Sequence, residues 1–280
     1  MPLFDTHAHY NLEPLYANWQ AYQSQAQAAA ITHTLVVGTD LKTCYNAIQL
    51  KKAAANFFLL SLGLHPNIVY QNNQLISESE LATICHQWSE LVKKNRPILS
   101  AIGECGLDFF QINKNSPIFP HLLERQIKLL KLQLRLAQEL ALPIVLHVRD
   151  SNCQQQSDNA YQLICQQVSS LVPNAKLIWH CFSGEKWYLQ QVLAMPHSYI
   201  SFAGNLTFKN APALRELFSQ VPAEKLLLET DAPFLSPEPV RGQICQPAFL
   251  AHTGKLAASL GADLEQIYQN SCSLFGEVEI

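Results

Sequence analysis

Six side chains of types that bind metal ions lie at or just after the ends of short apolar runs. They are His7, His9, Glu104, His147, His180 and Asp231. Mixed imidazole and carboxylate ligands suit Zn²⁺, Mn²⁺ or Mg²⁺ without selecting among them. Such ions lower the pKa of a bound water from about 16 to about 7, so hydroxide forms at neutral pH. The set therefore predicts metal-assisted hydrolysis with two divalent ions as cofactors.

The pair His7 and His9 is the first of these signals. Side chains at positions i and i+2 of a strand point to the same side, so two imidazoles spaced in this way can bind one cation. A lone His-x-His is a weak motif. Its place after the first apolar run, with Asp5 before it, strengthens the prediction.

Two carboxylates are candidates for catalytic roles. Glu104 lies between Gly103 and Cys105-Gly106, and flanking glycines allow close backbone approach. A carboxylate there can bridge two divalent ions, although a solvated surface glutamate is the alternative. Asp231 ends the last apolar run and can bind a metal and accept a proton from water, because a carboxylate beside a cation stays ionised.

The remaining candidates surround this set. His147 and His180 each end an apolar run; one buried histidine is more often part of the core, but two on neighbouring strands favour ligands. His65, Arg149 and Arg241 are candidates for binding a substrate phosphate. The alternatives are a loop cap for His65 and a surface ion pair for Arg149.

The elements that must position these residues follow a regular alternation. Eight apolar runs predict buried parallel strands at 3–7, 34–38, 57–63, 98–103, 143–147, 176–181, 199–203 and 225–230. Helical periodicity predicts helices at 12–30, 43–55, 79–94, 121–140, 161–171, 186–194, 211–220, 247–260 and 264–275. We therefore predict an α/β fold, a (β/α)8 TIM barrel of the metallo-dependent hydrolase type. The carboxyl ends of its strands converge at one mouth.

Length and charge agree with this prediction. The 280 residues suit one barrel, so we expect a single domain over residues 1–280. The net charge of −3 provides no global field to attract long nucleic acid, but it allows a nuclease that binds only a strand end.

Cysteine usage and the ends of the chain bear on location. Eight widely spaced cysteines, Cys153 among them, form no Cys-x-x-Cys pair and predict reduced thiols. We see no signal peptide and no apolar run of the ~18 residues that a membrane span requires. The expectation is a cytoplasmic protein without a membrane contact or an obligate protein partner.

An ordered set of motifs resembles the TatD family of metal-dependent deoxyribonucleases, within the amidohydrolase-like barrels. The motifs span 4–9, 63–66, 102–108, 146–149, 180–184, 228–235 and 270–275. The resemblance implies a two-metal phosphodiesterase, with 3′-5′ exonuclease action on DNA ends or short single-stranded DNA. It also implies the ligand sets. One ion would bind His7, His9, Glu104 and Asp231, and the other would share Glu104 with His147 and His180.

The chain departs from the family pattern at two places, where Tyr10-Asn11 replaces Leu-Asp and Gln243-Ile244-Cys245-Gln246 replaces Lys-Arg-Asn-Glu. The second change removes two positive charges and leaves room for a metal-dependent amide or lactone hydrolase. A non-catalytic barrel with a structural metal is a third hypothesis, although six ligands exceed what a structural site needs. For the nuclease, base-stacking candidates are Tyr10, Phe109, Phe110, Trp187 and Phe208.

Overall fold

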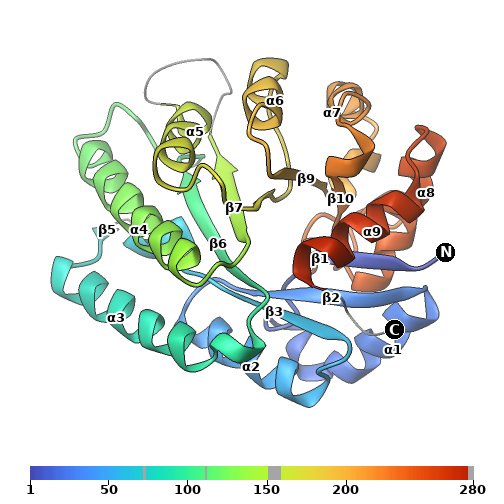
Figure 1. Cartoon of the computed structure of the whole chain (residues 1–280), viewed down its shortest axis with the longest axis horizontal. Coiled ribbons are helices and arrows are strands. Elements are labelled where there is room, and N and C mark those ends of the chain that lie inside the picture. Colours follow the sequence, from blue (N-terminus) through green and yellow to red (C-terminus); the bar gives the residue numbers. More distant parts are fainter. Residues whose placement is uncertain (72–73, 111, 151–158, 277–280) are drawn as a thin grey trace.

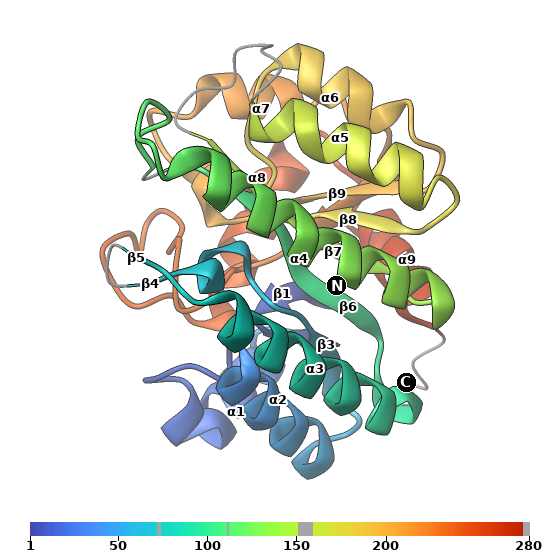
Figure 2. The same cartoon turned by 90° about the vertical axis from the view of Figure 1, so that its left-hand side faces the viewer.

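A computed structural model describes residues 1–71, 74–110, 112–150 and 159–276. Eight of the described strands form one parallel sheet, in the order β1-β2-β3-β6-β7-β8-β9-β10, that curls into a barrel with helices outside (Figures 1 and 2). The strands are β1 (Leu3–Ala8), β2 (Ile31–Gly38), β3 (Phe58–Leu62), β6 (Ala101–Asp108), β7 (Ile144–Arg149), β8 (Leu177–Trp179), β9 (Ser198–Phe202) and β10 (Leu226–Leu228). The predicted (β/α)8 barrel is confirmed.

Helices lie between the strands, as the periodicity predicted. They are α1 (Trp19–Ala28), α2 (Leu41–Ala53), α3 (Glu78–Lys94), α4 (Phe119–Glu139), α5 (Ala160–Leu171), α6 (Lys186–Leu193), α7 (Pro212–Phe218), α8 (Leu250–Ser259) and α9 (Leu264–Phe275). The first helix begins at Trp19 instead of residue 12, after a 3-10 turn at Tyr16–Asn18. No helix within the described ranges is both long and apolar enough to cross a membrane.

Five strand predictions need correction by two or more residues at an end. The strand β2 begins at Ile31, three residues earlier than predicted, and β7 continues to Arg149, two residues further. The strand β6 begins later than predicted and continues to Asp108, so Glu104 lies inside the strand and not just past its end. The strands β8 and β10 end at Trp179 and Leu228, earlier than predicted. A short hairpin of β4 (Tyr70–Gln71) and β5 (Gln74–Leu75) was not predicted, because two-residue polar strands carry no hydrophobic pattern.

The segment after β10 completes the barrel beside β1. Asp231 N donates to His7 O over 2.9 Å, and His9 N donates to Ala232 O over 2.7 Å. The Asp5 carboxylate accepts from the Thr230 backbone N–H over 2.9 Å and from its hydroxyl over 2.7 Å. These bonds place the two ends of the predicted site, more than two hundred residues apart in sequence, against each other.

Two glutamines of α4 fix the loops at the mouth. Gln133 accepts from Leu64 N over 2.8 Å and donates to Leu64 O over 2.9 Å. Gln126 accepts from Asp108 N over 2.9 Å and donates to Asp108 O over 3.0 Å. Both side chains are buried, so each satisfies a backbone N–H and C=O that water does not reach. The helix thereby positions the segments that carry His65 and Asp108.

The glycine before Glu104 permits the close approach that the sequence predicted. At Gly103, φ is +130°, and an added Cβ would collide with Val145 O and lie 2.9 Å from Val145 Cβ on β7. An added Cβ at Gly106 would likewise collide with His147 O. The strand carrying Glu104 therefore packs against the strand carrying His147 at a distance that only glycine allows.

Gly103→Ala should lower the free energy of unfolding by about 3 kcal/mol, since it combines a collision with an unfavourable backbone conformation. Gly261→Ala is the matched control, because φ is +91° and no atom lies within 4 Å of the added Cβ. It should cost only the backbone penalty of about 1 kcal/mol. Urea unfolding of both variants measures the difference. Equal losses would show that Gly103 is not sterically required.

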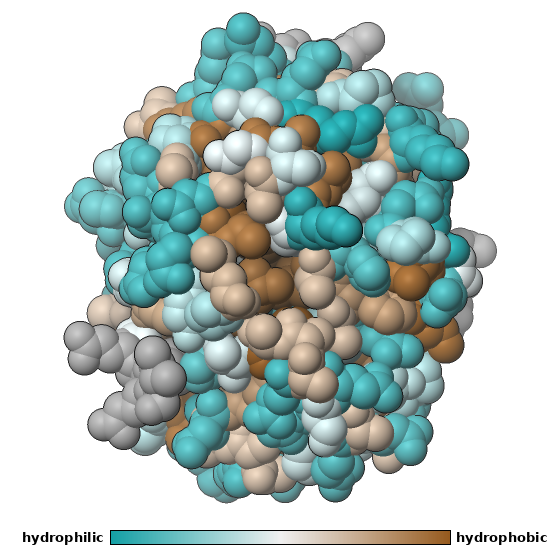
Figure 3. All heavy atoms as spheres, turned by 90° about the vertical axis from the view of Figure 1, so that its right-hand side faces the viewer, coloured by the Kyte–Doolittle hydropathy of each residue, from teal (hydrophilic) through white to brown (hydrophobic). Residues whose placement is uncertain are grey.

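The surface and the cysteines complete this description. On the face in Figure 3, hydrophilic side chains surround a smaller group of apolar ones. Across the described residues, the exposed large apolar side chains are Met1, Tyr45, Phe110, Phe234 and Ile244.

Seven cysteines are free thiols, which confirms the prediction for them, and Cys153 lies outside the described residues.

Candidate metal centre

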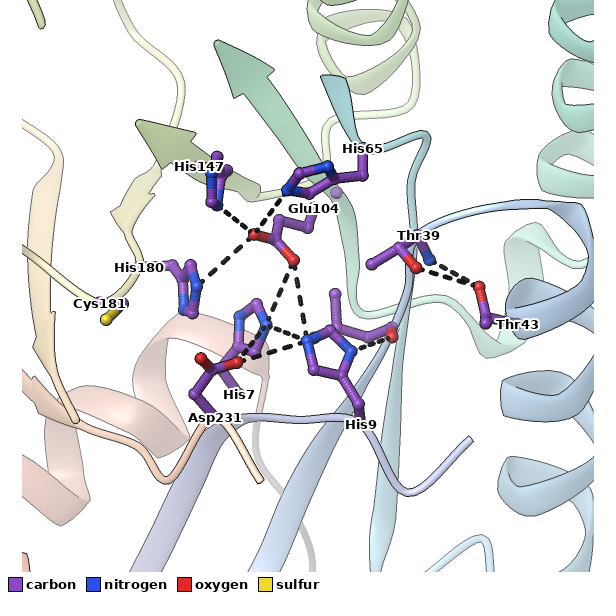
Figure 4. A network of polar contacts seen from close by, with 12 residues as sticks. His7, His9, Thr39, Thr43, His65, Glu104, His147, His180, Cys181 and Asp231 are labelled. Carbon is purple, nitrogen blue, oxygen red and sulfur yellow. Dashed lines mark hydrogen bonds and ion pairs between the residues drawn. The ribbon is translucent and has the colours of Figure 1, made fainter. Parts of the chain in front are cut away.

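The six predicted ligands converge at the carboxyl ends of the strands, around Glu104 (Figure 4). His7 lies in β1 and His9 just after it, His147 lies in β7, and His180 and Asp231 follow β8 and β10. Glu104 is 3% exposed, and its two oxygens face different partners. Oε2 is 3.5 Å from His7 Nε2 and 3.8 Å from His9 Nε2. Oε1 is 2.6 Å from His147 Nδ1 and 3.5 Å from His180 Nε2.

Asp231 joins the side of the cluster that holds the first two histidines. Its Oδ1 lies 3.4 Å from His9 Nε2 and 3.9 Å from His7 Nε2. The two Nε2 atoms are themselves only 3.2 Å apart. Four donor atoms from Asp231, Glu104 and the two imidazoles therefore face one small volume.

The outer ring nitrogens determine which inner nitrogens carry a lone pair. His9 Nδ1 lies 2.9 Å from Val37 O. A carbonyl only accepts, so this nitrogen carries a proton, and the lone pair that His9 can offer to a cation is on Nε2, which faces the cluster. His180 Nδ1 lies 2.8 Å from Glu229 Oε1, and His147 Nε2 lies 3.3 Å from Asp108 Oδ2. Outer acceptors of this kind are typical of metal-binding histidines, so the residues fit a divalent cation.

The two supporting acids have structural roles as well. Glu229 is fully buried and also accepts from Cys181 N over 2.7 Å. Asp108 accepts from Phe110 N over 3.0 Å and from Asn67 Nδ2 over 3.1 Å. Each acid therefore contacts one histidine and also fixes a loop.

The cluster keeps its carboxylates ionised. Burial by itself raises the pKa of Glu104, but the charges of His180 and His147 bring it well below its usual range. Burial also raises the pKa of Asp231, while a hydrogen bond to His9 and the charge of His180 bring it below its usual value. Two ionised acids among buried imidazoles form a donor set that suits Zn²⁺, Mn²⁺ or Mg²⁺.

His65 has the capping role, one of the two that the sequence left open. Its Nδ1 accepts from Asn67 N over 3.1 Å and caps the 3-10 helix Pro66–Val69. Its Nε2 faces the cluster, 3.8 Å from Glu104 Oε1. Burial, followed by the charge of His147, lowers the pKa of His65 to about 4, so the ring is neutral at pH 7. With Nδ1 accepting, the proton is on Nε2, and His65 presents a hydrogen-bond donor to the cavity.

The two arginines lie in different surroundings. Arg149 lines the cavity, and its guanidinium carbon is 3.8 Å from the centroid of the Phe110 ring. Over the part of the chain that the structure describes, no acid forms an ion pair with Arg149, in contrast to the surface pair considered above. Arg241 lies outside the cavity lining, 4.0 Å from the Phe208 centroid and 4.0 Å from Glu238 Oε1.

Two of the aromatic predictions are wrong. Tyr10 and Phe109 are completely buried and cannot stack on a base. Tyr10 packs against Phe58, whose ring centroid lies 4.8 Å away. The sequence also missed Phe234, which is 51% exposed and lines the cavity. Its position three residues after Asp231 was a signal that could have identified it.

A cavity of about 760 Å³ lies above the cluster. The candidate ligands apart from His7 line it, together with His65, Asp108, Arg149, Asn205 and Phe234. The volume suits a small number of nucleotides or a drug-sized molecule.

Comparison of the chain with models of known protein families gives its family. The model of the TatD related DNase family matches residues 4–276. The chain belongs to this TatD family. The fold is therefore that of a family of metal-dependent hydrolases, as the motifs predicted.

Relatives and solved structures agree with this assignment. An exonuclease of Erwinia amylovora, named 3′-5′ ssDNA/RNA exonuclease TatD, is 31% identical over 90% of this chain and 91% of its own length. YabD of Bacillus subtilis, an uncharacterized metal-dependent hydrolase, is 30% identical over 92% of this chain and 91% of its own length. The crystal structure of YjjV, a TatD homologue of Escherichia coli, covers 98% of this chain and 97% of its own, with 25% identity and a TM-score of 0.78.

Proposed function

We propose that this TatD family member is a two-metal phosphodiesterase, a 3′-5′ exonuclease on DNA ends or short single-stranded DNA. The observation that carries the proposal is the arrangement of the Glu104 carboxylate, whose two oxygens face separate histidine pairs. The name of the Erwinia amylovora relative supports the choice of substrate. We propose further that residues 1–280 form one domain that acts in the cytoplasm, in agreement with the free thiols.

The residues divide into two ligand sets that share one carboxylate. His7, His9, Glu104 and Asp231 would hold one ion, and Glu104, His147 and His180 would hold the other. Bound there, two divalent ions supply a hydroxide nucleophile near neutral pH and positive charge for the phosphoryl oxygens. Glu229 and Asp108 fix the ring orientations of His180 and His147.

The chain itself supplies a proton acceptor and the phosphate contacts. Asp231 is ionised and lies at the edge of the cavity with its side chain 14% exposed, so it can accept the proton of the attacking water. His65 Nε2–H and the Arg149 guanidinium face the same cavity and can bind phosphoryl oxygens. Arg241 lies outside the lining, so we assign it to phosphates farther along the strand.

The proposal is tested with a 5′-labelled single-stranded oligonucleotide, in Mg²⁺, Mn²⁺ and Zn²⁺ in turn. A ladder of products shortened from the 3′ end is expected, and a 3′-blocked strand should resist. Hydrolysis confined to a parallel panel of lactones and dipeptides would refute the nuclease and support the amide or lactone hydrolase. Metal binding without any hydrolysis would support the non-catalytic barrel.

A further inference from the structure

Two exposed phenylalanines follow the two strands that deliver the central carboxylates. Phe110 lies two residues after β6, the strand of Glu104, and is 44% exposed. Phe234 lies three residues after Asp231, beyond β10, and is 51% exposed. In the strand order β6 is fourth and β10 is eighth, so the two strands lie across the barrel from each other. The metal-ligand cluster lies between them.

Phe234 is held in place although half of its side chain faces solvent. Its backbone N donates to Asp231 O over 2.9 Å, and Cys245 N donates to Pro233 O over 3.0 Å. The ring meets the His9 ring edge-on, with centroids 6.0 Å apart. An exposed aromatic side chain that a fixed backbone presents in a cavity wall is a typical ligand contact.

On the opposite side, Arg149 lines the cavity and contacts the ring of Phe110, which lies outside the lining. Phe110 N donates to the Asp108 carboxylate, which fixes the start of this loop. The Arg149 guanidinium lies 3.8 Å from the ring centroid, a stacked cation–π contact. Stacking orients the guanidinium plane and leaves its N–H groups available to a phosphate.

We propose that these two walls are separate substrate subsites on opposite sides of the scissile phosphodiester. A base on one side stacks on Phe234, and Arg149, oriented by Phe110, binds the phosphate on the other side. The inference rests on the proposed nuclease function and narrows its substrate. Because the two subsites lie across the barrel from each other, the nucleotides on either side of the scissile phosphodiester cannot stay stacked. The substrate is therefore an unpaired strand whose terminal base is unstacked from its neighbour. A duplex end would first have to fray.

The first experiment pairs Phe234→Ala with abasic substrates. The substrates are a single-stranded oligonucleotide and two copies that lack the base of the last or of the penultimate nucleotide. With the wild-type protein, one of the two abasic strands should lose about tenfold in kcat/KM, the effect of one stacked base. On the intact strand, Phe234→Ala should have a kcat/KM about tenfold below that of the wild-type protein. On that abasic strand, the kcat/KM of Phe234→Ala should equal that of the wild-type protein. Phe234→Tyr should restore the wild-type pattern.

Tyr45→Ala is the matched control, because Tyr45 is 53% exposed on α2, away from the cavity lining. It should leave all three rates unchanged. Failure of the wild-type protein to cleave the intact strand would overturn the proposed function and the inference together. Normal cleavage, with Phe234→Ala equal to Tyr45→Ala on every strand, would overturn the inference alone.

The second experiment addresses the opposite wall through salt dependence. One lost phosphate contact should reduce the slope of log affinity against log salt by about 0.7 for a single strand. Arg149→Ala should show this reduction in binding of a phosphorothioate oligonucleotide, measured by fluorescence anisotropy. Phe110→Leu should weaken binding by about threefold and keep the slope, because it removes stacking but no charge. An unchanged slope in Arg149→Ala would refute the phosphate contact.

Discussion

Replacing Glu104 by Ala should abolish metal binding and hydrolysis together. Among the described residues, this carboxylate is the one whose two oxygens face both histidine pairs, so its removal takes a ligand from both sets. Loss of a residue that only orients a metal ligand typically lowers metal affinity or activity 10- to 100-fold. Loss of a ligand shared by two ions should cost at least as much. We expect kcat/KM to fall by more than about 100-fold and the metal content to fall with it.

The measurement combines steady-state rates with metal analysis of the purified protein. Divalent ions should raise the Tm of the wild-type protein and leave that of Glu104→Ala unchanged, because a ligand stabilises only a fold that binds it. Glu216→Ala on α7 is the control, since Glu216 is exposed and far from the cavity lining. Full activity of Glu104→Ala with unchanged metal stoichiometry would refute the shared-ligand role.

Asp231→Asn should reduce kcat by roughly 10²- to 10⁴-fold, the contribution of a positioned proton acceptor. The fold should be little affected, for a specific reason. Asp231 has φ +59°, a left-handed conformation that asparagine also tolerates, and the backbone bond from its N to His7 O is unchanged. An amide oxygen can still approach the cation but cannot accept the proton.

Rates, metal content and urea unfolding of Asp231→Asn separate these effects. We expect a urea unfolding midpoint close to that of the wild-type protein and a large loss in kcat. Asp231→Ala should lose stability as well, because alanine is strained at this φ. A near-normal kcat in Asp231→Asn would remove this aspartate from the mechanism.

The convergence of the candidate ligands was easier to predict than the strand ends. His-x-His spacing and the apolar runs before Glu104 and His147 were local signals, and the barrel brings these residues together as predicted. The early ends of β8 and β10 were not visible in the apolar runs, and left-handed backbone follows each strand, at Cys181 and at Asp231. Those turns let the chain leave the sheet where the candidate ligands stand.

Contacts between distant segments were also beyond the sequence. The Val37 carbonyl that orients His9 lies 28 residues away, and no motif marks a backbone acceptor. Exposure of the aromatic residues was equally hidden. Tyr10 is buried because Phe57 and Phe58, at the start of β3, pack against its ring, whereas Phe234 follows a proline and is half exposed. The position of Arg241 outside the cavity depends on its stacking on Phe208.

The most direct measurement is anomalous diffraction from crystals soaked in Mn²⁺ and, separately, in Zn²⁺. We predict two peaks on opposite sides of the Glu104 carboxylate, one bounded by His7, His9 and Asp231 and the other by His147 and His180. Absence of any peak between these side chains at saturating metal, or a single ion that does not contact Glu104, would contradict the two-metal site.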